Sequence, residues 1–527
     1  MHHPNRHGRI FANFAQSRRG GVAIIVAIML PLLIGLVFGV MDYSRLVSSK
    51  QILQDSLDAA ALYAARSSAV TDADLQTVGA QGLAANVINM HDATLVSSSF
   101  TAGSNGQKVI ASAQGSLRTT ILGLFGTNTL TFGATAEVMR SSKNLEVALI
   151  LDTTGSMKGQ NIIDLKAAAS DLLDIVVKPT QTPFYSKVAL VPYSMAVNVG
   201  TYATQVRGAI TAARAITGAS KAKTLVITST GHGFSVGDQI YITGMNGMTD
   251  LNGNIYTVSS KTSNTFQISD AGGVVDSRNF GTYISGGAAS CYTQGCEYYR
   301  FTSATGSTNT FQASTCVTER TGTNAYKDVA PSTTLLGRNY PSTSNPCLPN
   351  TITPLSSDKA ALKLKVNALQ AGGSTGGHIG IAWGWYMVSP NFGYLWPGAS
   401  AAAAYTAPDL IKAVVLMTDG EYNSVYCNGV IAKDSTTGSG AADLHESCNA
   451  ANGSSYSQAA TLCTNMKNAG VVVYVVGFQV VNTQAARDLV NNCATDAAHV
   501  YLPSTGTDLK TAFQAIGLDL SRLRLSQ

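Results

Sequence analysis

Carboxylate and hydroxyl side chains that could hold a metal ion cluster in a short segment behind an apolar run. The run EVALILD (146–152) ends in Asp152 and is followed by Thr153-Thr154-Gly155-Ser156. A hard divalent cation prefers oxygen ligands in a near-octahedral arrangement. Alternate residues on a tight loop point the same way, and Gly155 permits the sharp turn. The segment therefore predicts a cation site built on Asp152, Thr154 and Ser156.

Two later segments offer the same kind of oxygen. In Gly372-Gly373-Ser374-Thr375-Gly376 a hydroxyl lies in a flexible loop before a helix-like stretch. In Met417-Thr418-Asp419-Gly420 a carboxylate follows directly after the apolar run KAVVLM. We expect Thr375, with Ser374 as the alternative, and Asp419 to complete the site.

The elements that must position these loops alternate between strand and helix. Ligands of an open parallel sheet bind at the carboxyl ends of its strands, and such alternation predicts a doubly wound parallel sheet in an α/β fold. The expected strands are 145–152, 187–193, 411–418, 472–478 and 499–502, and the expected helices are 160–177, 357–370, 378–388, 456–469, 484–493 and 506–520.

The stretch 200–350 interrupts that pattern and is predicted to be an insertion. Its middle has short alternating strands divided by Gly, Asn and Asp turns, which is typical of a small all-β module. Through GHGFSVGDQIYI and NGNIYTV it faintly resembles β-barrel modules of phage structural proteins and of ubiquitin-activating enzymes. We infer a binding or spacer role and no chemistry. The part 290–350 is expected to be loop-like and stapled by its four cysteines.

An apolar segment near the N-terminus is long enough to cross a bilayer. Residues 20–41 contain no charged side chain, and about 20 apolar residues span the hydrocarbon core as a helix. Arg6, Arg9, Arg18 and Arg19 precede it, so the positive-inside rule predicts a cytoplasmic N-terminus and an exported remainder. A cleaved signal peptide would have a shorter apolar region, and a buried core helix would not explain the basic flank. We expect an uncleaved anchor.

The next hundred residues are expected to form an α+β stalk. Apolar positions over 44–68 line one helical face, 72–90 can form a second helix, and 93–99, 107–114 and 129–139 have strand character. A long N-terminal helix with a small sheet packed on it is a pilin-like plan. The alternative is an ordinary membrane-proximal spacer.

All eight cysteines lie in the second half of the chain, which favours disulfides formed in an oxidising compartment. The alternative, free or metal-binding thiols, is weakened because no C-x-x-C pair occurs. Cys463 and Cys493 flank one predicted strand, so we expect a bridge between their helices; Cys448 is the other candidate partner of Cys463. Cys427 and Cys448 bracket a loop after Asp419 and are expected to close it.

The three oxygen-bearing motifs resemble the metal-ion-dependent adhesion site of von Willebrand factor A domains. DTTGS, the GGST loop and LMTDGE match that family in the same order. The resemblance implies that five residues bind Mg²⁺, with Ca²⁺ or Mn²⁺ as alternatives. One coordination position of the ion is left for water or for a carboxylate of a partner protein. These residues are Asp152, Thr154, Ser156, Thr375 and Asp419.

Both ends of the chain resemble TadE/TadG-type proteins of Tad (Flp) pilus assembly. The segments are RRGGVAIIVAIMLPLLIGLVFGVMDYSR with LQDSLDAAALYAA, then VALVPYSMAVNVG, GGSTGGHIGIAWGWYMVSP, VVLMTDGEYN and FQAIGLDLSRLRLS. The resemblance implies a single-pass protein of the bacterial inner membrane whose bulk is periplasmic or extracellular, with pilus-assembly components as partners. No Glu follows Gly21 closely, so we expect no prepilin-type cleavage.

Other function classes have less support. Only 12% of residues are charged and the net charge is +5, which argues against nucleic-acid binding. No G-x-S-x-G, H-E-x-x-H or P-loop pattern occurs, so we expect no enzyme. His378 as a base and Glu421 as an activator of metal-bound water are the weak catalytic candidates, and Trp383, Trp385 and Tyr386 are expected in the core.

The expected function is thus a membrane-anchored envelope protein that binds a protein partner through a metal site. A structural envelope scaffold and a metal-dependent hydrolase are the alternatives. The expected domains are a cytoplasmic tail (1–19), a transmembrane helix (20–41), the stalk (42–141), a von Willebrand factor A domain (142–199 and 351–522) and the insertion (200–350).

Overall fold

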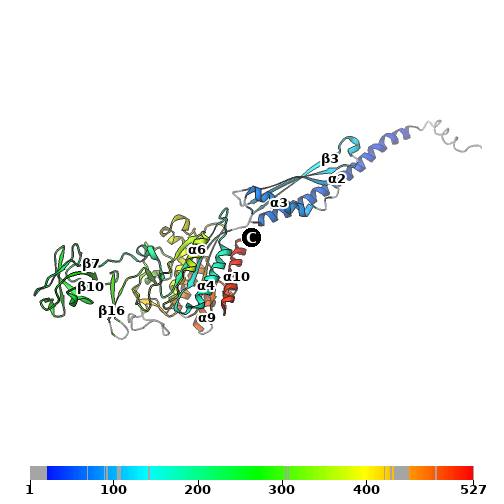
Figure 1. The fold of residues 1–527 in the computed structure, drawn as a ribbon. Helices are drawn as coiled ribbons and strands as arrows, with labels where there is room; N and C mark the ends of the chain where they lie inside the picture. Colours follow the sequence, from blue (N-terminus) through cyan, green and yellow to red (C-terminus); the bar gives the residue numbers. More distant parts are fainter. Residues whose placement is uncertain are drawn as a thin grey trace, which may run out of the picture. The chain divides into compact units, whose positions relative to one another are not determined.

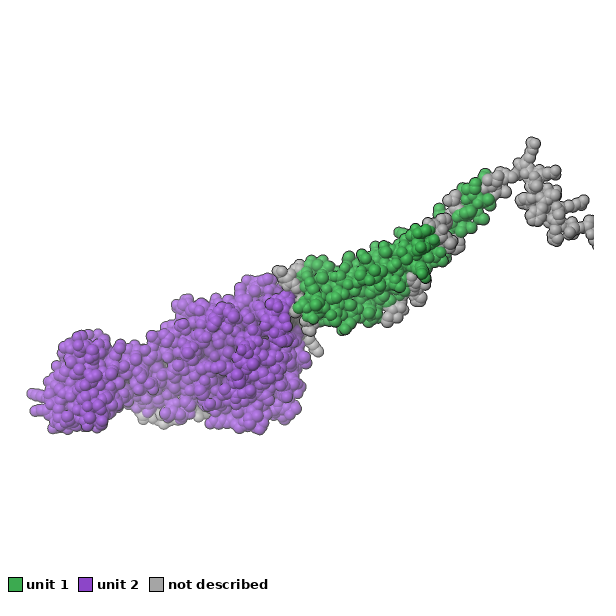
Figure 2. All heavy atoms as spheres, turned by 45° about the horizontal axis from the view of Figure 1, so that its top comes forward, with its two compact units in different colours: residues 1–142, 527 green, residues 143–526 purple. Residues whose placement is uncertain are grey.

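The fold is taken from a computed structural model, and it divides into two compact units. One comprises residues 1–142 with residue 527, and the other residues 143–526 (Figure 2). The structure describes residues 20–525 apart from 68, 70, 88–89, 91–92, 104–107, 121, 140–142, 303–305, 307, 421, 428–429, 432–449 and 481–483.

The first unit packs two helices against a three-stranded antiparallel sheet (Figure 1). Its elements are helices α2 (Gly20–Arg66) and α3 (Asp72–Asn86) and strands β1 (Ala93–Gly103), β2 (Lys108–Arg118) and β3 (Thr129–Met139). The 47-residue helix α2 exposes the described large apolar side chains between Ile25 and Met41, whereas Leu53, Leu57 and Ala61 in its second half are buried. The helix is long and apolar enough to be a candidate for a single membrane span.

Asp42, the first acid after the apolar segment, connects α2 to the β2–β3 connection. Its buried carboxylate accepts backbone N–H groups of Thr120 at 3.1 Å and Leu122 at 3.1 Å, and it pairs with Arg45 at 3.3 Å. A buried carboxylate that accepts several hydrogen bonds is stabilised in its charged form. These contacts fix the helix in register with the sheet.

The second unit is built on a six-stranded sheet in the order β19-β5-β4-β20-β23-β24. Strands β5 to β24 pair in parallel, and β19 is antiparallel to β5 at one edge. The strands are β4 (Asn144–Asp152), β5 (Ser186–Tyr193), β19 (Thr353–Ser356), β20 (Leu410–Thr418), β23 (Val472–Gly477) and β24 (Val500–Tyr501).

Helices cover both faces of this sheet, because its strands are apolar on both sides. On β4, Leu149 packs into one core, and Ile150 packs into the other. One face carries α4 (Gln160–Val176), α6 (Lys359–Asn367) and α10 (Gly506–Leu525), and the other carries α7 (Gly377–Val388), α8 (Ser455–Asn468) and α9 (Gln484–Cys493). The predicted α/β class is confirmed, and the predicted helices agree closely. Strand β19 was not predicted, since four residues at an edge give little periodic signal.

The insertion contains the expected all-β module, an antiparallel sheet around its own core. Its strands are β7 (Arg214–Ala215), β8 (Gly218–Ala219), β9 (Val226–Thr228), β10 (Gln239–Asn246), β11 (Asn254–Lys261), β12 (Thr265–Asp270), β13 (Gly273–Val274) and β14 (Ser285–Cys291). The prediction that 290–350 is loop-like is wrong in part. A hairpin joins β15 (Tyr298–Thr302) to β16 (Thr308–Gln312), and β17 (Cys316–Thr318) pairs with both β18 (Gly337–Arg338) and β6 (Val197–Asn198).

Three disulfides lie among the described residues of the second unit. Cys291–Cys296 and Cys316–Cys347 staple the insertion, and Cys463–Cys493 joins α8 to α9, as predicted. The alternative pairing of Cys463 with Cys448 is therefore wrong. Cys448 lies outside the described residues, so its pairing with Cys427 stays a prediction. Short elements complete the unit: α5 (Ala203–Arg207), β21 (Tyr426–Cys427) and β22 (Val430–Ile431).

Candidate metal centre

The three predicted oxygen-bearing loops meet at one edge of the parallel sheet. Asp152 is the last residue of β4, Thr418 is the last residue of β20, and the Gly-rich loop leads into α7. Because neighbouring parallel strands end at the same edge, their following loops are adjacent. The sequence alternation therefore placed these loops correctly.

Asp152 is the centre of the cluster. Its Oδ1 accepts hydrogen bonds from the Thr154 backbone N–H at 3.0 Å and from the Thr154 hydroxyl at 2.7 Å. Its Oδ2 lies 3.3 Å from both the Asp419 backbone nitrogen and the Thr418 hydroxyl. The Thr154 and Ser156 hydroxyls are 2.9 Å apart. Four of the five predicted ligands, Asp152, Thr154, Ser156 and Asp419, are thus joined directly by hydrogen bonds.

The loop that carries Thr375 is held against the first segment through its backbone. The Gly155 N–H donates to Gly373 O at 2.8 Å, and the Gly372 N–H donates to Thr153 O at 2.9 Å. Gly373 has φ of +79°, a conformation that favours glycine. A Cβ on Gly155 would lie 3.1 Å from Gly373 O, so glycine allows this close approach. Thr375, the fifth predicted ligand, is therefore carried by a loop that contacts the segment after Asp152.

Ser374 and Thr375 differ in their hydrogen bonds. The Ser374 hydroxyl accepts from Asn345 Nδ2 at 2.7 Å and lies 2.6 Å from the Ser424 hydroxyl. Thr375 is buried, and its backbone is fixed on both sides by Asn423, whose Oδ1 accepts from Thr375 N at 2.8 Å. Because the Ser374 hydroxyl is engaged with Asn345 and Ser424, Thr375 is the better candidate of the two.

The electrostatics of the cluster favour an added positive charge. Burial raises the pKa of Asp152, although hydrogen bonds from Tyr193 and Thr154 oppose the shift. Burial and the neighbouring charge of Asp152 raise the pKa of Asp419 to about 8. Within the described residues neither carboxylate has an ion pair with Lys, Arg or His. Two carboxylates so close together, one buried and one partly buried, repel unless a proton or a cation neutralises them.

The donor set fits a hard divalent cation. Carboxylates and hydroxyls are the ligands of Mg²⁺, Ca²⁺ and Mn²⁺, whereas structural zinc sites use thiolate and imidazole. Among the described residues no group of three or more His, Cys, Asp or Glu side chains is arranged so that it could hold a metal ion. The cation could be held by the carboxylates of Asp152 and Asp419 and by the neighbouring hydroxyls of Thr154, Ser156 and Thr375.

Tyr193 belongs to the site but was not predicted from the sequence. Its hydroxyl donates to Asp152 Oδ2 at 2.6 Å, and burial together with the charge of Asp152 raises its pKa. The sequence signal that could have revealed Tyr193 is its position as the last residue of the predicted strand 187–193. The structure pairs it directly with Asp152 in the register of β4 and β5. A Cβ on Gly380 of α7 would lie 2.8 Å from the Tyr193 ring, so glycine lets the helix pack there.

His378 lies at the start of α7, in contact with the insertion. It is completely buried, and its Nε2 is hydrogen-bonded to Glu319 of the insertion. Glu319 Oε1 also accepts from the Tyr426 backbone and from Gln458 Nε2, each at 3.1 Å. His378 and Glu319 therefore join the insertion to the start of α7 and to the segment after Asp419.

The remaining sequence candidates have simple outcomes. Trp383, Trp385 and Tyr386 are buried in the core between α7 and the sheet, as predicted. Glu421 lies outside the described residues.

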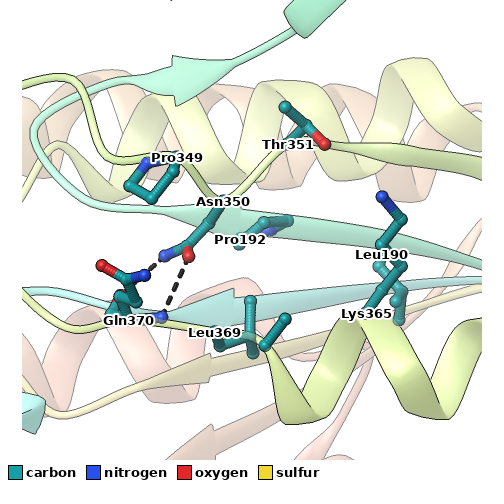
Figure 3. A pocket seen from close by; sticks show the side chains of 9 residues that line it. Leu190, Pro192, Pro349, Asn350, Thr351, Lys365, Leu369 and Gln370 are labelled. Atoms are coloured by element: carbon teal, nitrogen blue, oxygen red, sulfur yellow. Dashed lines mark hydrogen bonds between the residues drawn. The ribbon is translucent and has the colours of Figure 1, made fainter.

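A cavity of about 220 Å³ lies where the Gly-rich loop begins (Figure 3). Asn350, at the end of the insertion, crosses it to the backbone of Gln370: Asn350 Nδ2 donates to Gln370 O at 2.6 Å, and Gln370 N donates to Asn350 Oδ1 at 2.9 Å. The lining residues are Leu190, Pro192, Pro349, Asn350, Thr351, Lys365, Ala368, Leu369 and Gln370.

Two segments of the chain match family models. Residues 20–67 match the putative Flp pilus-assembly TadE/G-like family, and residues 221–292 match the FCCH domain of ubiquitin-activating enzyme E1. The first match confirms the pilus-related resemblance of the N-terminal segment, and the second confirms the faint resemblance of the β-module. No curated protein sequence matches the chain.

Solved structures similar to the chain include adhesins of pili. The pilus adhesin SpaC from Lactobacillus rhamnosus GG is 9% identical with a TM-score of 0.33, and the alignment covers 82% of this chain but only 34% of the adhesin. The vWF domain of the type V pilus tip protein Mfa5 from Porphyromonas gingivalis is 10% identical over 73% of this chain and 97% of that domain, with a TM-score of 0.33.

A third similar structure comes from a mussel protein. Proximal thread matrix protein 1 from the mussel byssus, described with a zinc-occupied MIDAS motif, is 12% identical. The alignment covers 72% of this chain and 48% of that protein, and the TM-score is 0.29.

Proposed function

We propose that this chain is a membrane-anchored cell-envelope protein of Tad/Flp pilus assembly or surface attachment. Its parallel-sheet unit is a von Willebrand factor A-type domain that binds a protein partner through a divalent cation, most simply Mg²⁺. The ligands are Asp152, Thr154, Ser156, Thr375 and Asp419, and a carboxylate of the partner completes the coordination. The anchor is helix α2, with the N-terminus in the cytoplasm and the second unit outside.

One observation carries this proposal: three segments far apart in the sequence converge on Asp152. The Asp152 carboxylate accepts hydrogen bonds from Thr154 in its own loop and from the Thr418 hydroxyl and the Asp419 backbone N–H at the end of β20. The Gly-rich loop joins them through Gly373. A cluster assembled only for stability would pair a buried carboxylate with a positive side chain, whereas this one gathers oxygen atoms.

The exported location has separate support. The family match over residues 20–67 belongs to pilus assembly, and the described part of the second unit contains three disulfides. Disulfides persist in oxidising compartments such as the periplasm. A reporter enzyme fused after residue 527 should be active only outside the cytoplasm, and activity inside would reject the proposed orientation.

The metal site is tested by titrating the full chain in detergent micelles with Mg²⁺, Ca²⁺ and Mn²⁺ by calorimetry. We expect binding by the wild type and none by Asp152→Ala. Asp174→Ala is the matched control, because Asp174 is an exposed carboxylate in the last turn of α4 and pairs with Lys363. No cation binding by the wild type at millimolar concentration would leave only a structural scaffold.

The biological role is tested with the same variants in cells. Asp152→Ala should abolish pilus formation or surface attachment, and Asp174→Ala should preserve both. Normal pili and attachment with Asp152→Ala, at normal protein levels, would show that the cation site has no role in partner binding.

A further inference from the structure

The inserted segment contacts the Gly-rich loop more closely than a spacer would. Asn345 lies two residues before Cys347, and its side-chain amide grips Ser374 on two sides: Oδ1 accepts from the Ser374 backbone N–H at 2.9 Å, and Nδ2 donates to the Ser374 hydroxyl at 2.7 Å. Both residues are buried. A Cβ on Gly373 would lie 2.9 Å from Asn345 Oδ1, so the amide also lies directly against that glycine.

A second asparagine, Asn350, makes a similar contact with Gln370, four residues before Ser374. Asn350 makes two hydrogen bonds with the backbone of Gln370, at 2.6 and 2.9 Å. Two side-chain amides from the same segment, 345–350, therefore fix both the beginning and the middle of the stretch that leads to Thr375. A side-chain amide that both donates and accepts specifies one orientation of the backbone it binds.

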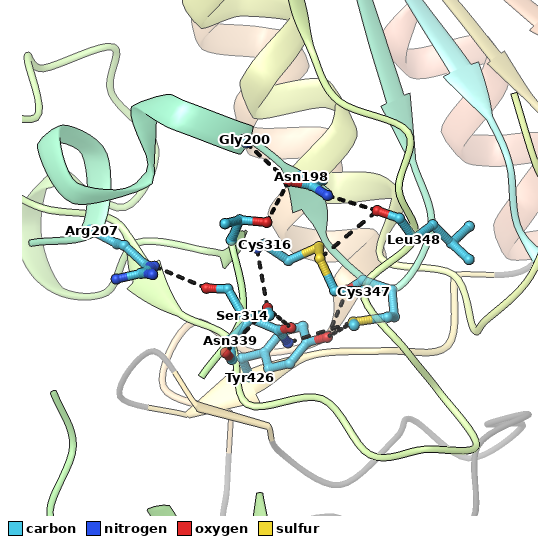
Figure 4. The surroundings of a disulfide bond; sticks show 11 residues. Asn198, Gly200, Arg207, Ser314, Cys316, Asn339, Cys347, Leu348 and Tyr426 are labelled. Carbon is cyan, nitrogen blue, oxygen red and sulfur yellow. Dashed lines mark hydrogen bonds between the residues drawn. A yellow bond between two sulfur atoms is a disulfide. The ribbon is translucent and has the colours of Figure 1, made fainter. Parts of the chain in front are cut away.

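The segment 345–350 is itself held in place by a covalent bond (Figure 4). Cys347 is joined to Cys316 of β17, which pairs with β6 directly after β5. Asn198 of β6 donates to Leu348 O at 2.7 Å and accepts from the Thr315 hydroxyl at 2.8 Å. The disulfide and Asn198 thus tie the segment to the sheet.

We propose that Asn345 and Asn350 are positioning residues for the cation site, and that the Cys316–Cys347 disulfide keeps them in place. The inference rests on the proposed cation binding and deepens it: the insertion sets the affinity of the site by fixing the loop that carries Thr375. Groups that orient metal ligands without touching the metal typically change its affinity by about 10- to 100-fold.

The test is a Mg²⁺ titration of the full chain in detergent micelles, with thermal unfolding measured on each variant. Asn345→Ala should weaken Mg²⁺ binding about tenfold or more, and Asn350→Ala should weaken it less. Asn339→Ala is the control, because Asn339 is also completely buried in the insertion but its amide contacts Ser314 and Met195 instead of the Gly-rich loop. It should lower the unfolding temperature without changing Mg²⁺ affinity.

A pair of cysteine variants tests the same inference without altering either asparagine. Cys316→Ser with Cys347→Ser should weaken Mg²⁺ binding, whereas Cys291→Ser with Cys296→Ser, which removes the disulfide at the β-module, should preserve it. Wild-type affinity in folded Asn345→Ala overturns the inference. If Asn345→Ala does not fold, wild-type affinity in the Cys316–Cys347 variant overturns it.

The outcomes separate this inference from the proposed function. Mg²⁺ binding that is lost in Asp152→Ala but unchanged in both the Asn345 and the cysteine variants rejects the positioning role alone. A wild-type chain that binds no Mg²⁺ rejects the cation site and the positioning role with it.

Discussion

Strand β4 carries a buried carboxylate near each end, and the two are treated in opposite ways. Near its start, Glu146 pairs with Lys412, its direct neighbour on β20, at 2.5 Å. Glu146 also accepts from the Tyr185 hydroxyl at 3.0 Å and the Ala403 N–H at 2.9 Å. At the other end Asp152 meets hydroxyls, backbone amides and a second carboxylate. The Glu146 end of the strand is electrostatically complete, whereas at the incomplete, Asp152 end no described residue supplies a pairing positive charge.

This difference separates a carboxylate that is neutralised within the sheet from one that the proposed cation would neutralise. A buried charge costs several kcal/mol unless it is paired and hydrogen-bonded. Lys412 supplies that pairing permanently and also donates to Val388 O at 2.8 Å. At Asp152 no described Lys, Arg or His supplies such a pairing, and the proposed cation would meet the same requirement.

The largest loss of stability is expected when the ion pair between Glu146 and Lys412 is removed. Lys412→Met should destabilise the second unit by about 3–5 kcal/mol, because it leaves Glu146 buried without its partner. All three tryptophans, Trp383, Trp385 and Trp396, lie in this unit, so their fluorescence in a urea titration of the full chain measures it.

Two variants control that measurement. Lys363→Met removes an exposed ion pair with Asp174 and should cost less than about 1 kcal/mol. Glu146→Gln combined with Lys412→Met should recover part of the loss. A change below 1 kcal/mol in Lys412→Met would mean that the two ends of β4 do not differ as described.

A smaller effect is expected at the incomplete end, and only with a cation present. Saturating Mg²⁺ should stabilise the wild type by about 2.7 kcal/mol at 100 times its dissociation constant. Asp419→Asn should lose this gain, because one of the two carboxylates is gone. The measurement is the same urea titration with and without Mg²⁺, and equal stabilisation of both proteins would contradict the assignment of Asp419.

The smallest effect concerns the hydroxyl that Tyr193 donates to Asp152. Tyr193→Phe should cost about 1.5 kcal/mol, the lower end for a hydrogen bond to a charged group, and should weaken Mg²⁺ binding less than Asp152→Ala does. Tyr394→Phe is the control, because Tyr394 is exposed and its hydroxyl accepts from the Ser332 N–H. Unchanged stability in Tyr193→Phe would show that Asp152 does not depend on this contact.

The sequence revealed the incomplete end better than the complete one. Asp152, Thr154 and Ser156 are neighbours in the chain, and Asp419 follows an apolar strand, so local pattern was enough to find them. Glu146 and Lys412 are interior positions of two strands, 266 residues apart, and only the strand register brings them together. No spacing rule on one strand reveals such a pair.

The insertion was the least predictable region for a related reason. Its contacts with the site come from single side chains, such as Asn345 and Glu319, which lie in short irregular stretches without periodicity. Strands β17 and β18 are two or three residues long and pair with distant segments. Such elements exist because of their tertiary partners, so the local sequence carries almost no record of them.

The β-module has one further consequence through its two chain ends. The Thr211 N–H donates to Gly295 O at 2.9 Å, and the Glu297 N–H donates to Thr211 O at 2.9 Å, so the chain leaves and re-enters at neighbouring points. Domains with adjacent ends are readily inserted, exchanged or deleted. Exchanging residues 212–296, which keeps the Cys291–Cys296 disulfide within the exchanged segment, would therefore leave the strand order of the parallel sheet and the Cys316–Cys347 link intact.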